Sequence, residues 1–416
     1  MINLSNSDGE KRENSWKFLV LVVVLIVAVV GLVYEGWLLQ VQNEKISKLE
    51  NQLSSLNKKV TFLVGKLENL NNVIFNLSKT YQPTPSVSNV YENVKDSVVV
   101  VEGVSVKVIN TFFGPMIHVV RVEGSGFVCE YNGSCYILTN NHVVNNIQNI
   151  TVTFLDGDAY PAKLIGSDVC SDLAVLKVDA PISKFKPLKI VSSSNLHVGD
   201  LVIAVGNPFG LSGTLTTGVI SQLGRSIHET ETGGYSIADI IQTTAPINPG
   251  SSGGPLLNCN GEVIGITTAI IPGAQNICFA IPSDTILREL PSLIKNGTYN
   301  HPWLGIIVVD VTPAIAKFMG LNITYGVLIQ SVIPDGPAAK AGIKAGNQKV
   351  QIEGQTVVVG GDVIIAINHA KIRNHDDLST YLERNTKPNQ TIQLTIIRDG
   401  KKIDIPLTLG VRPLKK

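Results

Sequence analysis

The stretch Asn248-Pro249-Gly250-Ser251-Ser252-Gly253-Gly254-Pro255-Leu256 decides how the rest of the chain is interpreted. Its glycines leave backbone N–H groups bare around two adjacent serines, and such amides can bind the charge on an attacked carbonyl oxygen. A serine hydroxyl is a good nucleophile only when a neutral imidazole takes its proton, and that imidazole needs a carboxylate to fix its tautomer. The stretch therefore predicts a partner histidine and a partner acid elsewhere in the chain.

Two upstream segments supply these partners. His142 ends an apolar run in Leu138-Thr139-Asn140-Asn141-His142-Val143-Val144, and Asp172 opens another in Ser171-Asp172-Leu173-Ala174-Val175-Leu176. The chain order is His, Asp, Ser, which is that of chymotrypsin-type proteases, whereas α/β-hydrolases run Ser, Asp, His and subtilisins Asp, His, Ser. We predict that His142 is the general base and Asp172 the acid that orients it.

The α/β-hydrolase alternative uses the same Gly250-x-Ser252-x-Gly254 pattern but requires a helix directly after the serine. Gly253-Gly254-Pro255 opposes a helix. The later histidines, His301, His369 and His375, belong to a separate C-terminal unit. The sequence itself excludes this alternative.

Five segments together resemble the HtrA/Deg family of serine proteases, over the chain from about Val94 to the C-terminus. They are Gly124-Ser125-Gly126-Phe127, Thr139–Val144, Asp172–Leu176, Gly206-Asn207-Pro208-Phe209-Gly210 and Asn248–Leu256. The resemblance implies a mainly β fold: a chymotrypsin-like double β-barrel protease domain followed by an α+β PDZ domain.

The resemblance also selects Ser252, rather than the adjacent Ser251, as the nucleophile. The N–H groups of Gly250 and Ser252 would then form the oxyanion hole. The chain departs from the family twice. Gly250-Ser251-Ser252 stands where Gly-Asn-Ser is usual, and Thr244-Ala245-Pro246 stands where Asp-Ala-Ala is usual.

In chymotrypsin-like folds the substrate pocket is walled by residues just before the nucleophile and by the strand after it. Here these residues are Pro246, Ile247, Thr267, Thr268 and Ala269. No acid is present among them to bind Lys or Arg, and Ile247 should shorten the pocket against large aromatic side chains. We expect cleavage after small aliphatic residues, with a broad preference because one methylene contributes only ~1–3 kcal/mol in such a pocket.

The composition limits the other function classes. The 34 basic and 33 acidic residues give no basic field for nucleic acid. The 416-residue chain has no Gly-x-x-x-x-Gly-Lys-Ser/Thr, so nothing suggests nucleotide hydrolysis. Seven histidines without His-Glu-x-x-His, and five cysteines without Cys-x-x-Cys, predict neither a metal site nor a cofactor.

Cys129 and Cys135 flank an Asn132-Gly133 hairpin signal. A three-residue loop would place the two cysteines opposite each other and permit a disulfide, whereas a two-residue turn would stagger them. Two buried apolar thiols are the equal alternative.

An unbroken apolar run, Phe18–Tyr34, predicts a transmembrane helix over residues 18–39. The rival reading is a cleavable signal peptide, but Val33-Tyr34-Glu35-Gly36-Trp37 lacks the small residues of a cleavage site. The positive-inside rule favours a cytoplasmic segment 1–17 and an extracytoplasmic body, since Lys11, Arg12 and Lys17 precede the span.

Residues 40–79 carry a heptad pattern that predicts a coiled coil. Its apolar positions are Ile46, Leu49, Leu53, Leu56, Val60, Leu63, Leu67, Leu70, Ile74 and Leu77. The core residues leave dimer and trimer open, but Val64 and Val73 widen the apolar stripe toward more than two strands. Since family members are built from trimers, we expect a homotrimer.

The remaining boundaries follow from composition. Residues 80–90 are a Pro- and Ser-rich linker, and short β-branched runs without intervening helices predict all-β barrels over residues 91–297. Residues 300–412 resemble the PDZ domain of the family, with Gly361-Asp362-Val363-Ile364 matching a family strand.

Trp303-Leu304-Gly305-Ile306 stands where the family has its carboxylate-binding loop, so the resemblance implies that the amides of Leu304, Gly305 and Ile306 bind the carboxylate of a peptide C-terminus. Ile306, Leu378 and Leu382 are the candidates for the pocket that receives the last apolar side chain. An alternative of almost equal weight is that these three simply fill the domain core.

Two functions from different classes fit these observations. The first is a membrane-anchored, ATP-independent serine endopeptidase that degrades unfolded or damaged extracytoplasmic proteins, a quality-control role that rests on the resemblance. The second is a PDZ-based binding or chaperone protein with regulated or residual proteolysis. The complete His142, Asp172 and Ser252 set favours the first.

Overall fold

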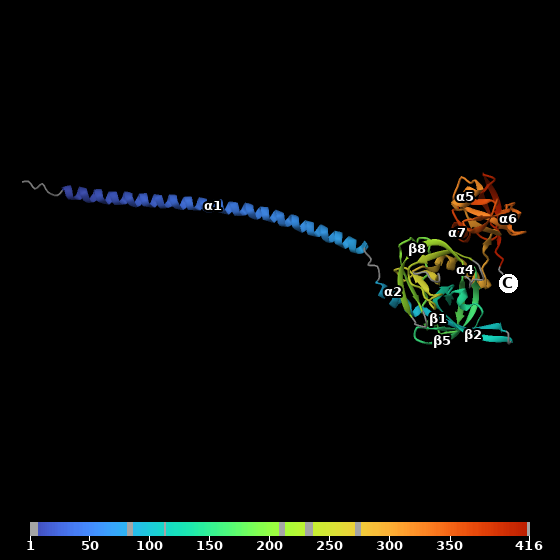
Figure 1. The fold of residues 1–416 in the computed structure, drawn as a ribbon. Coiled ribbons are helices and arrows are strands. Elements are labelled where there is room, and N and C mark those ends of the chain that lie inside the picture. Colours follow the sequence, from blue (N-terminus) through green and yellow to red (C-terminus); the bar gives the residue numbers. More distant parts are fainter. Residues whose placement is uncertain are drawn as a thin grey trace, which may run out of the picture. The chain divides into compact units, whose positions relative to one another are not determined.

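The structure is a computed structural model that describes residues 7–80, 86–111, 114–207, 213–228, 236–270 and 276–413. The chain divides into two units, Met1–Pro83 and Thr84–Lys416 (Figure 1). Pro208-Phe209-Gly210 of the motif quoted above lies outside the described residues.

In its described part, the first unit is one continuous helix, α1 (Ser7–Thr80), of 74 residues. It contains both the predicted span and the heptad pattern. Its apolar part, within Ser15–Phe75, reaches a mean hydropathy of 2.9 and is long and apolar enough to cross a membrane, by length and composition alone. Phe18 of the predicted span is 69% exposed and Leu53 of the heptads 60% exposed. Both apolar faces are therefore open to a membrane or to another helix.

The second unit begins with two closed six-stranded antiparallel barrels. The first has the strand order β1-β2-β3-β6-β5-β4 and the second β10-β11-β12-β9-β8-β7. The first barrel contains β1 (Val98–Thr111), β2 (Gly114–Tyr131), β3 (Ser134–Thr139), β4 (Ile147–Thr153), β5 (Ala159–Asp168) and β6 (Leu173–Val178). The second contains β7 (Leu201–Gly206), β8 (Thr214–His228), β9 (Ser236–Thr243), β10 (Pro255–Leu257), β11 (Val263–Ile270) and β12 (Cys278–Pro282).

Two apolar clusters explain why β1 opens with four consecutive valines. Val99 and Val101 fill the interior of the first barrel, whereas Val98 packs into a cluster shared by both barrels, with Phe127 of the first and Ile266 of the second. Because successive side chains of a strand point to opposite faces, a strand buried on both faces is apolar throughout.

Two helices close the cluster between the barrels. Val90 of α2 (Val87–Val94) and Leu293 of α4 (Ser283–Asn296) are buried in it. Helix α2 and strand β5 carry no strong signal in the sequence. The exposure pattern of β5 alternates, but polar and small residues such as Lys163 and Gly166 interrupt its apolar positions.

The C-terminal part of the second unit contains an antiparallel sheet. Its strand order is β14-β15-β18-β20-β21, with β14 (Ile306–Asp310) at one edge. Its other elements in this sheet are β15 (Val327–Val332), β18 (Val363–Ile367), β19 (Ala370–Lys371), β20 (Thr391–Arg398) and β21 (Lys401–Thr408). Smaller elements are β13 (Pro302–Trp303), β16 (Gln348–Ile352), β17 (Gln355–Val359), β22 (Gly410–Val411), α5 (Pro313–Met319), α6 (Pro337–Lys340) and α7 (His375–Asn385). The predicted mainly β fold, with a double barrel followed by an α+β unit, is confirmed.

The hairpin between β2 and β3 shows which of the two turn lengths separates Cys129 and Cys135. Tyr131 pairs with Ser134 and Glu130 with Cys135, so Asn132-Gly133 is a two-residue turn. The cysteines are therefore staggered, because Cys129 faces Tyr136. Both are free thiols, and burial raises the pKa of Cys129 to about 12.

Candidate active site

Strand pairing in the first barrel brings His142 and Asp172 together. β3 pairs with β6 in a register that places Thr139 opposite Ala174. His142 lies in the short helix α3 (Asn141–Val144) just after β3, and Asp172 directly precedes β6. Both side chains therefore emerge at the same end of this strand pair.

The Asp172 carboxylate binds His142 at two points. Oδ2 lies 2.8 Å from Nδ1 of the imidazole, and Oδ1 accepts the backbone N–H of His142 at 2.9 Å. Thr268 Oγ1 donates a further hydrogen bond of 2.6 Å to Oδ2. Since the carboxylate is 1% exposed, its charge holds the proton on Nδ1 and leaves Nε2 as the basic nitrogen.

The backbone at Asp172 is held in the left-handed region, with φ of 56°. This conformation costs a non-glycine residue about 1–3 kcal/mol and persists only where the surroundings enforce it. Here the Asp172 carbonyl oxygen accepts the backbone N–H of Asn141 at 3.1 Å and the side-chain amide of Asn140 at 3.0 Å. Asn140 and Asn141, which directly precede His142, thus also hold the backbone of Asp172 in place.

The two candidate serines face different neighbours. Ser252 Oγ donates to the carbonyl oxygen of Thr268 at 2.8 Å, and the hydroxyl of the same threonine binds Asp172. A Cβ built on Gly206 would lie 3.2 Å from Cβ of Ser251, so this serine packs against the end of β7 instead. Ser252 is therefore the serine that shares a direct neighbour with the acid.

From Gly250 to Gly253, along the loop that carries the two serines, every second backbone N–H donates a hydrogen bond within the described residues. Within the described residues, the N–H of Ser251 donates to Asn248 and that of Gly253 to Thr267, whereas those of Gly250 and Ser252 have no acceptor. Gly250, with φ of 93°, adopts a conformation that favours glycine. Two N–H groups two residues apart are thus available for an external oxygen.

Ser125 supports this loop from the first barrel. Its N–H donates to the Ser252 carbonyl oxygen at 2.8 Å and its hydroxyl to the Gly250 carbonyl oxygen at 2.7 Å. The same hydroxyl accepts the backbone N–H of Asn207 at 2.8 Å. Ser125 and Asn207 belong to motifs that carry the resemblance to the HtrA/Deg family, but no pattern in the sequence indicates these contacts.

The predicted pocket residues divide by their contacts. Ile247 is buried and Pro246 exposed. The hydroxyls of Thr267 and Thr268 are directed to other partners: Thr267 donates to the carbonyl oxygens of Ser251 and Gly254, and Thr268 to Asp172. Ala269 lies in β11, and its side chain is outside the described residues.

The predicted peptide-binding residues of the C-terminal unit lie close together. Leu304 and Gly305 precede β14, and Ile306 begins it. Leu304, Ile306, Leu378 and Leu382 share one apolar cluster, in which Ile306 is only partly buried. Leu378 and Leu382 of α7 are 3% and 6% exposed, so both the pocket and the core-filling alternatives stay open.

Comparison with known proteins places both domains. Residues 124–266 match a trypsin-like peptidase domain, and residues 302–409 match a PDZ domain. The chain is 42% identical over 297 residues to a probable periplasmic serine endoprotease, DegP-like, from Brucella suis, covering 71% of this chain and 53% of that protein. It is 39% identical over 301 residues to the chloroplastic Protease Do-like 1 from Arabidopsis thaliana, covering 72% and 66%. The chain thus spans about half the length of the bacterial relative.

Solved structures agree over more of their own length. An HtrA-type protease, AlgW, determined with a decapeptide, has 32% sequence identity and a TM-score of 0.61, covering 79% of this chain and all of that one (100%). A serine endoprotease from Yersinia pestis has 30% identity and a TM-score of 0.53, covering 79% and 99%. With its double barrel, its clustered His, Asp and Ser and its PDZ domain, the chain belongs to the HtrA-type family of serine endoproteases.

Proposed function

We propose that this protein is a membrane-anchored, ATP-independent serine endopeptidase with Ser252 as its nucleophile. The observation that carries the proposal is the path from Asp172 to His142 on one side and through Thr268 to Ser252 on the other. His142 is the general base in this proposal, and Asp172 orients it.

The reaction would begin with a turn of the Ser252 hydroxyl. A hydroxyl has one proton, and here it is donated to the Thr268 carbonyl oxygen. Redirected to Nε2 of His142, the proton leaves as Oγ attacks the scissile carbonyl carbon. The carbonyl oxygen then becomes an oxyanion held by the Gly250 and Ser252 amides, which contribute roughly 10²–10³ in rate.

The intermediate would collapse when His142 returns the proton to the amine of the leaving peptide, and the peptide C–N bond breaks. Water then enters, gives a proton to His142 and attacks the acyl-enzyme. The proton finally returns to Ser252 as the new carboxyl group leaves. No cofactor is needed in this scheme.

The substrate pocket favours small aliphatic residues in this proposal. Buried Ile247 limits the depth, and the loop before the nucleophile, Thr244-Ala245-Pro246, carries no acid. A tryptic preference in a peptide library would contradict this specificity.

The PDZ domain would bind extended C-termini by strand addition. β14 is an edge strand, which leaves one side without a strand partner in the described sheet. Helix α7 contributes Leu378 and Leu382 to the apolar cluster that also contains Ile306 of β14. The solved AlgW relative was determined with a decapeptide, which supports peptide binding by the family.

Helix α1 would anchor the protein with residues 1–17 in the cytoplasm and the protease domain outside. The exposed apolar surface of residues 18–39 suits a bilayer, and one curated relative is named as periplasmic. Degradation of unfolded or damaged proteins is the role that such a location and a broad pocket suit best.

The exposed heptad residues of α1 would assemble a parallel homotrimer. Single-span anchors of one orientation require a parallel arrangement, and the exposed Val64 and Val73 widen the stripe between helices. Crosslinking of detergent-extracted full-length protein tests this: a dimer or a monomer would refute the trimer. A truncated chain starting at Val87 that remains trimeric would instead assign assembly to the protease domain.

Casein degradation by matched serine variants tests the main proposal. Ser252→Ala should abolish cleavage while the melting temperature and assembly stay unchanged, and Ser251→Ala should retain activity. The reverse result would assign the nucleophile to Ser251. Retained cleavage in both variants would favour neither serine and reject the mechanism.

A further inference from the structure

A dense group of buried charges surrounds His301, which lies between α4 and β13. The imidazole is 3% exposed, yet both of its ring nitrogens contact carboxylates. The charged and titratable groups around it are Asp168 of β5, Cys170 in the next turn, Arg288 and Glu289 of α4, Tyr299, Glu383 of α7 and Arg412 after β22.

His301 connects one acid of the protease domain with one acid of the PDZ domain. Nε2 lies 2.7 Å from Asp168 Oδ2, and Nδ1 lies 2.9 Å from Glu383 Oε2. A neutral imidazole has one N–H, so both nitrogens can donate only in the charged form. With both carboxyl groups ionised, the two contacts therefore place an imidazolium between two carboxylates.

The pKa shifts agree with this assignment. Burial lowers the pKa of His301, but the charges of Asp168 and Glu383 and their hydrogen bonds outweigh it and raise the pKa well above its usual value. Burial raises the pKa of Asp168, but the charge of His301 and the hydrogen bonds from His301 and Ser171 outweigh it. Burial also raises the pKa of Glu383, but the hydrogen bond and charge of His301, together with the charges of Arg412 and Arg288, outweigh it, so both pKa values stay below their usual values.

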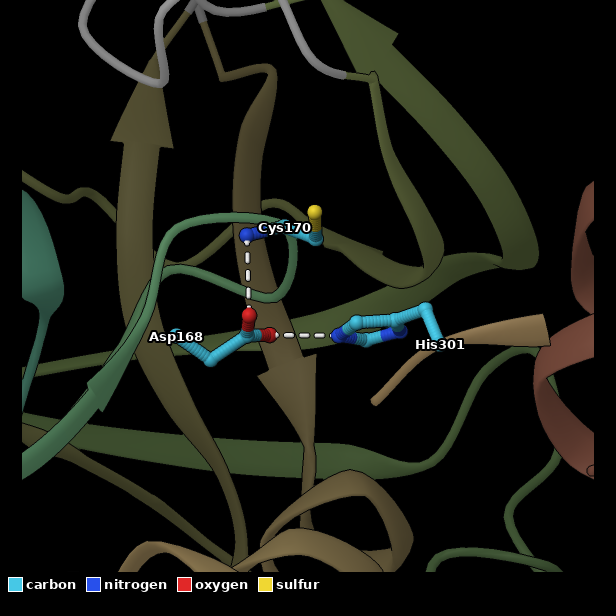
Figure 2. Close-up of side chains that lie close together, drawn as sticks. All are labelled: Asp168, Cys170 and His301. Carbon is cyan, nitrogen blue, oxygen red and sulfur yellow. Dashed lines mark hydrogen bonds and ion pairs between the residues drawn. The ribbon is translucent and has the colours of Figure 1, made fainter. Parts of the chain in front are cut away.

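Asp168 also organises the turn that ends at the proposed catalytic acid. Its Oδ1 accepts the Cys170 backbone N–H at 3.3 Å, and its Oδ2 accepts the Ser171 backbone N–H at 2.9 Å. Figure 2 shows the Asp168 carboxylate between the Cys170 backbone nitrogen and the His301 ring. Asp172 directly follows Ser171 in the chain, and its left-handed backbone needs the support of this turn.

A metal site is the alternative interpretation of the side chains around His301. Asp168, Cys170 and His301 place three possible ligand atoms within 4.8 Å of one another, and they are types that zinc accepts. However, Asp168 Oδ2 already accepts hydrogen bonds from His301 and from the N–H and hydroxyl of Ser171. The guanidinium groups of Arg288 and Arg412, which both contact Glu383, add positive charge that opposes a cation. The hydrogen-bonded ion pairs therefore account for the cluster.

We infer that His301 is a positioning residue for proteolysis: bound between Asp168 and Glu383, its imidazolium ties the turn that carries Asp172 to helix α7 of the PDZ domain. This inference rests on the proposed role of Asp172. When His301 loses its proton, one of the two contacts loses its donor. The Asp168 turn is then less constrained, and Asp172 holds His142 less well.

The pH profile of kcat for full-length protein in detergent tests this role. His142 must be neutral, so it sets the acidic limb, whereas His301 must be charged and sets an alkaline limb. The wild type should lose kcat as pH rises through the raised pKa of His301, with KM unchanged. His301→Gln should lower kcat at pH 7 by about tenfold or more and abolish the alkaline limb. An unchanged kcat and an unchanged limb would overturn the inference.

Glu383→Gln provides a second test if His301→Gln unfolds. It removes one of the two anions that hold the imidazolium but keeps an acceptor oxygen for Nδ1. The alkaline limb should therefore move to lower pH, and an unmoved limb would contradict the inference.

Arg384→Gln is the matched control on the same helix. Arg384 Nε donates to Asp239 Oδ2 of β9 at 2.7 Å, so it joins α7 to the second barrel without touching the Asp168 turn. It should leave the limb in place. If it produces the same kcat loss as His301→Gln, general docking of the PDZ domain is responsible and the specific role fails. Activity in the wild type upholds the proposed function in either case.

Discussion

Ser252 and Thr268 are joined by a 2.8 Å hydrogen bond from the serine hydroxyl to the threonine carbonyl oxygen, while the threonine hydroxyl binds Asp172 at 2.6 Å. Thr268 therefore contacts two of the three proposed catalytic residues. Its backbone accepts the serine hydroxyl, and its side chain holds the acid in the orientation that the proposed mechanism needs.

Thr268→Val should lower kcat with little change in KM. The substitution keeps the carbonyl oxygen and the side-chain shape but removes one donor to a buried carboxylate, which contributes about 1.5–3 kcal/mol. Hydrolysis of a peptide substrate should therefore slow by about 10–100-fold. Thr391→Val, at an exposed hydroxyl pair with Thr408, is the control and should be unaffected. A normal kcat in Thr268→Val would show that Asp172 does not need this bond.

Gly253→Ala should destabilise the fold and abolish activity. A Cβ there would lie 2.0 Å from the Ser125 carbonyl oxygen, and φ is 90°. Gly133→Ala is a matched control, because its φ of 75° imposes similar strain but nothing lies within 4 Å. The control should cost about 1–2 kcal/mol, and Gly253→Ala clearly more, in urea unfolding. Equal losses of unfolding free energy in the two variants would mean that the loop moves and relieves the clash with the Ser125 carbonyl oxygen.

Glu289→Gln should stabilise the protein above neutral pH. Ser171 Oγ contacts both Asp168 Oδ2, at 2.6 Å, and Glu289 Oε2, at 2.5 Å, yet it has one proton to donate. Burial, followed by the charge of Asp168, raises the pKa of Glu289 to about 7, so a protonated Glu289 can supply the second proton. A glutamine amide reproduces this neutral donor.

The sign of the pH dependence follows from that raised pKa. The neutral Glu289 stabilises the fold fully below its unfolded pKa of about 4.3, and the contribution is lost as pH rises through about 7. The wild type should lose about 2–3 kcal/mol of unfolding free energy between pH 5 and pH 8 from this group. Glu289→Gln should remove that loss. Glu262→Gln is the control, because the pKa of this acid is lowered by Lys189, and this variant should keep the loss. If the unfolding free energy of all three proteins depends on pH in the same way, Glu289 is not the group responsible.

A peptide with a free apolar C-terminus should bind the PDZ domain at least tenfold more tightly than the same peptide amidated. The reason is that a carboxylate held by backbone N–H groups forms charge-assisted hydrogen bonds, whereas an amide does not. Fluorescence anisotropy on the full chain measures both affinities. Equal affinities would indicate that the Leu304-Gly305-Ile306 amides do not receive the peptide terminus.

The sequence predicts the elements whose signal is local. Asn248–Leu256 and the segments around His142 and Asp172 are recognisable because chemistry and turn geometry restrict them to a few residue types. The heptads of α1 are visible because they repeat one helical pattern, and the predicted span is visible because its apolar run is unbroken.

Contacts between distant segments could not be predicted in the same way. The sequence predicts Thr268 in the substrate pocket, but its bond to Asp172 depends on how β11 approaches a turn 96 residues earlier in the chain. The sequence predicts only that His301 lies outside the protease domain, because its partners Asp168 and Glu383 lie 133 and 82 residues away in the chain. Such roles follow from packing and not from spacing.

Fluorophosphonate labelling followed by mass mapping tests the central claim most directly, because only an activated serine reacts with the probe. The account predicts one adduct, on Ser252, that is lost in Ser252→Ala and strongly reduced in His142→Ala, but retained in Ser251→Ala. An adduct on Ser251, or no adduct on folded wild-type protein, would contradict it.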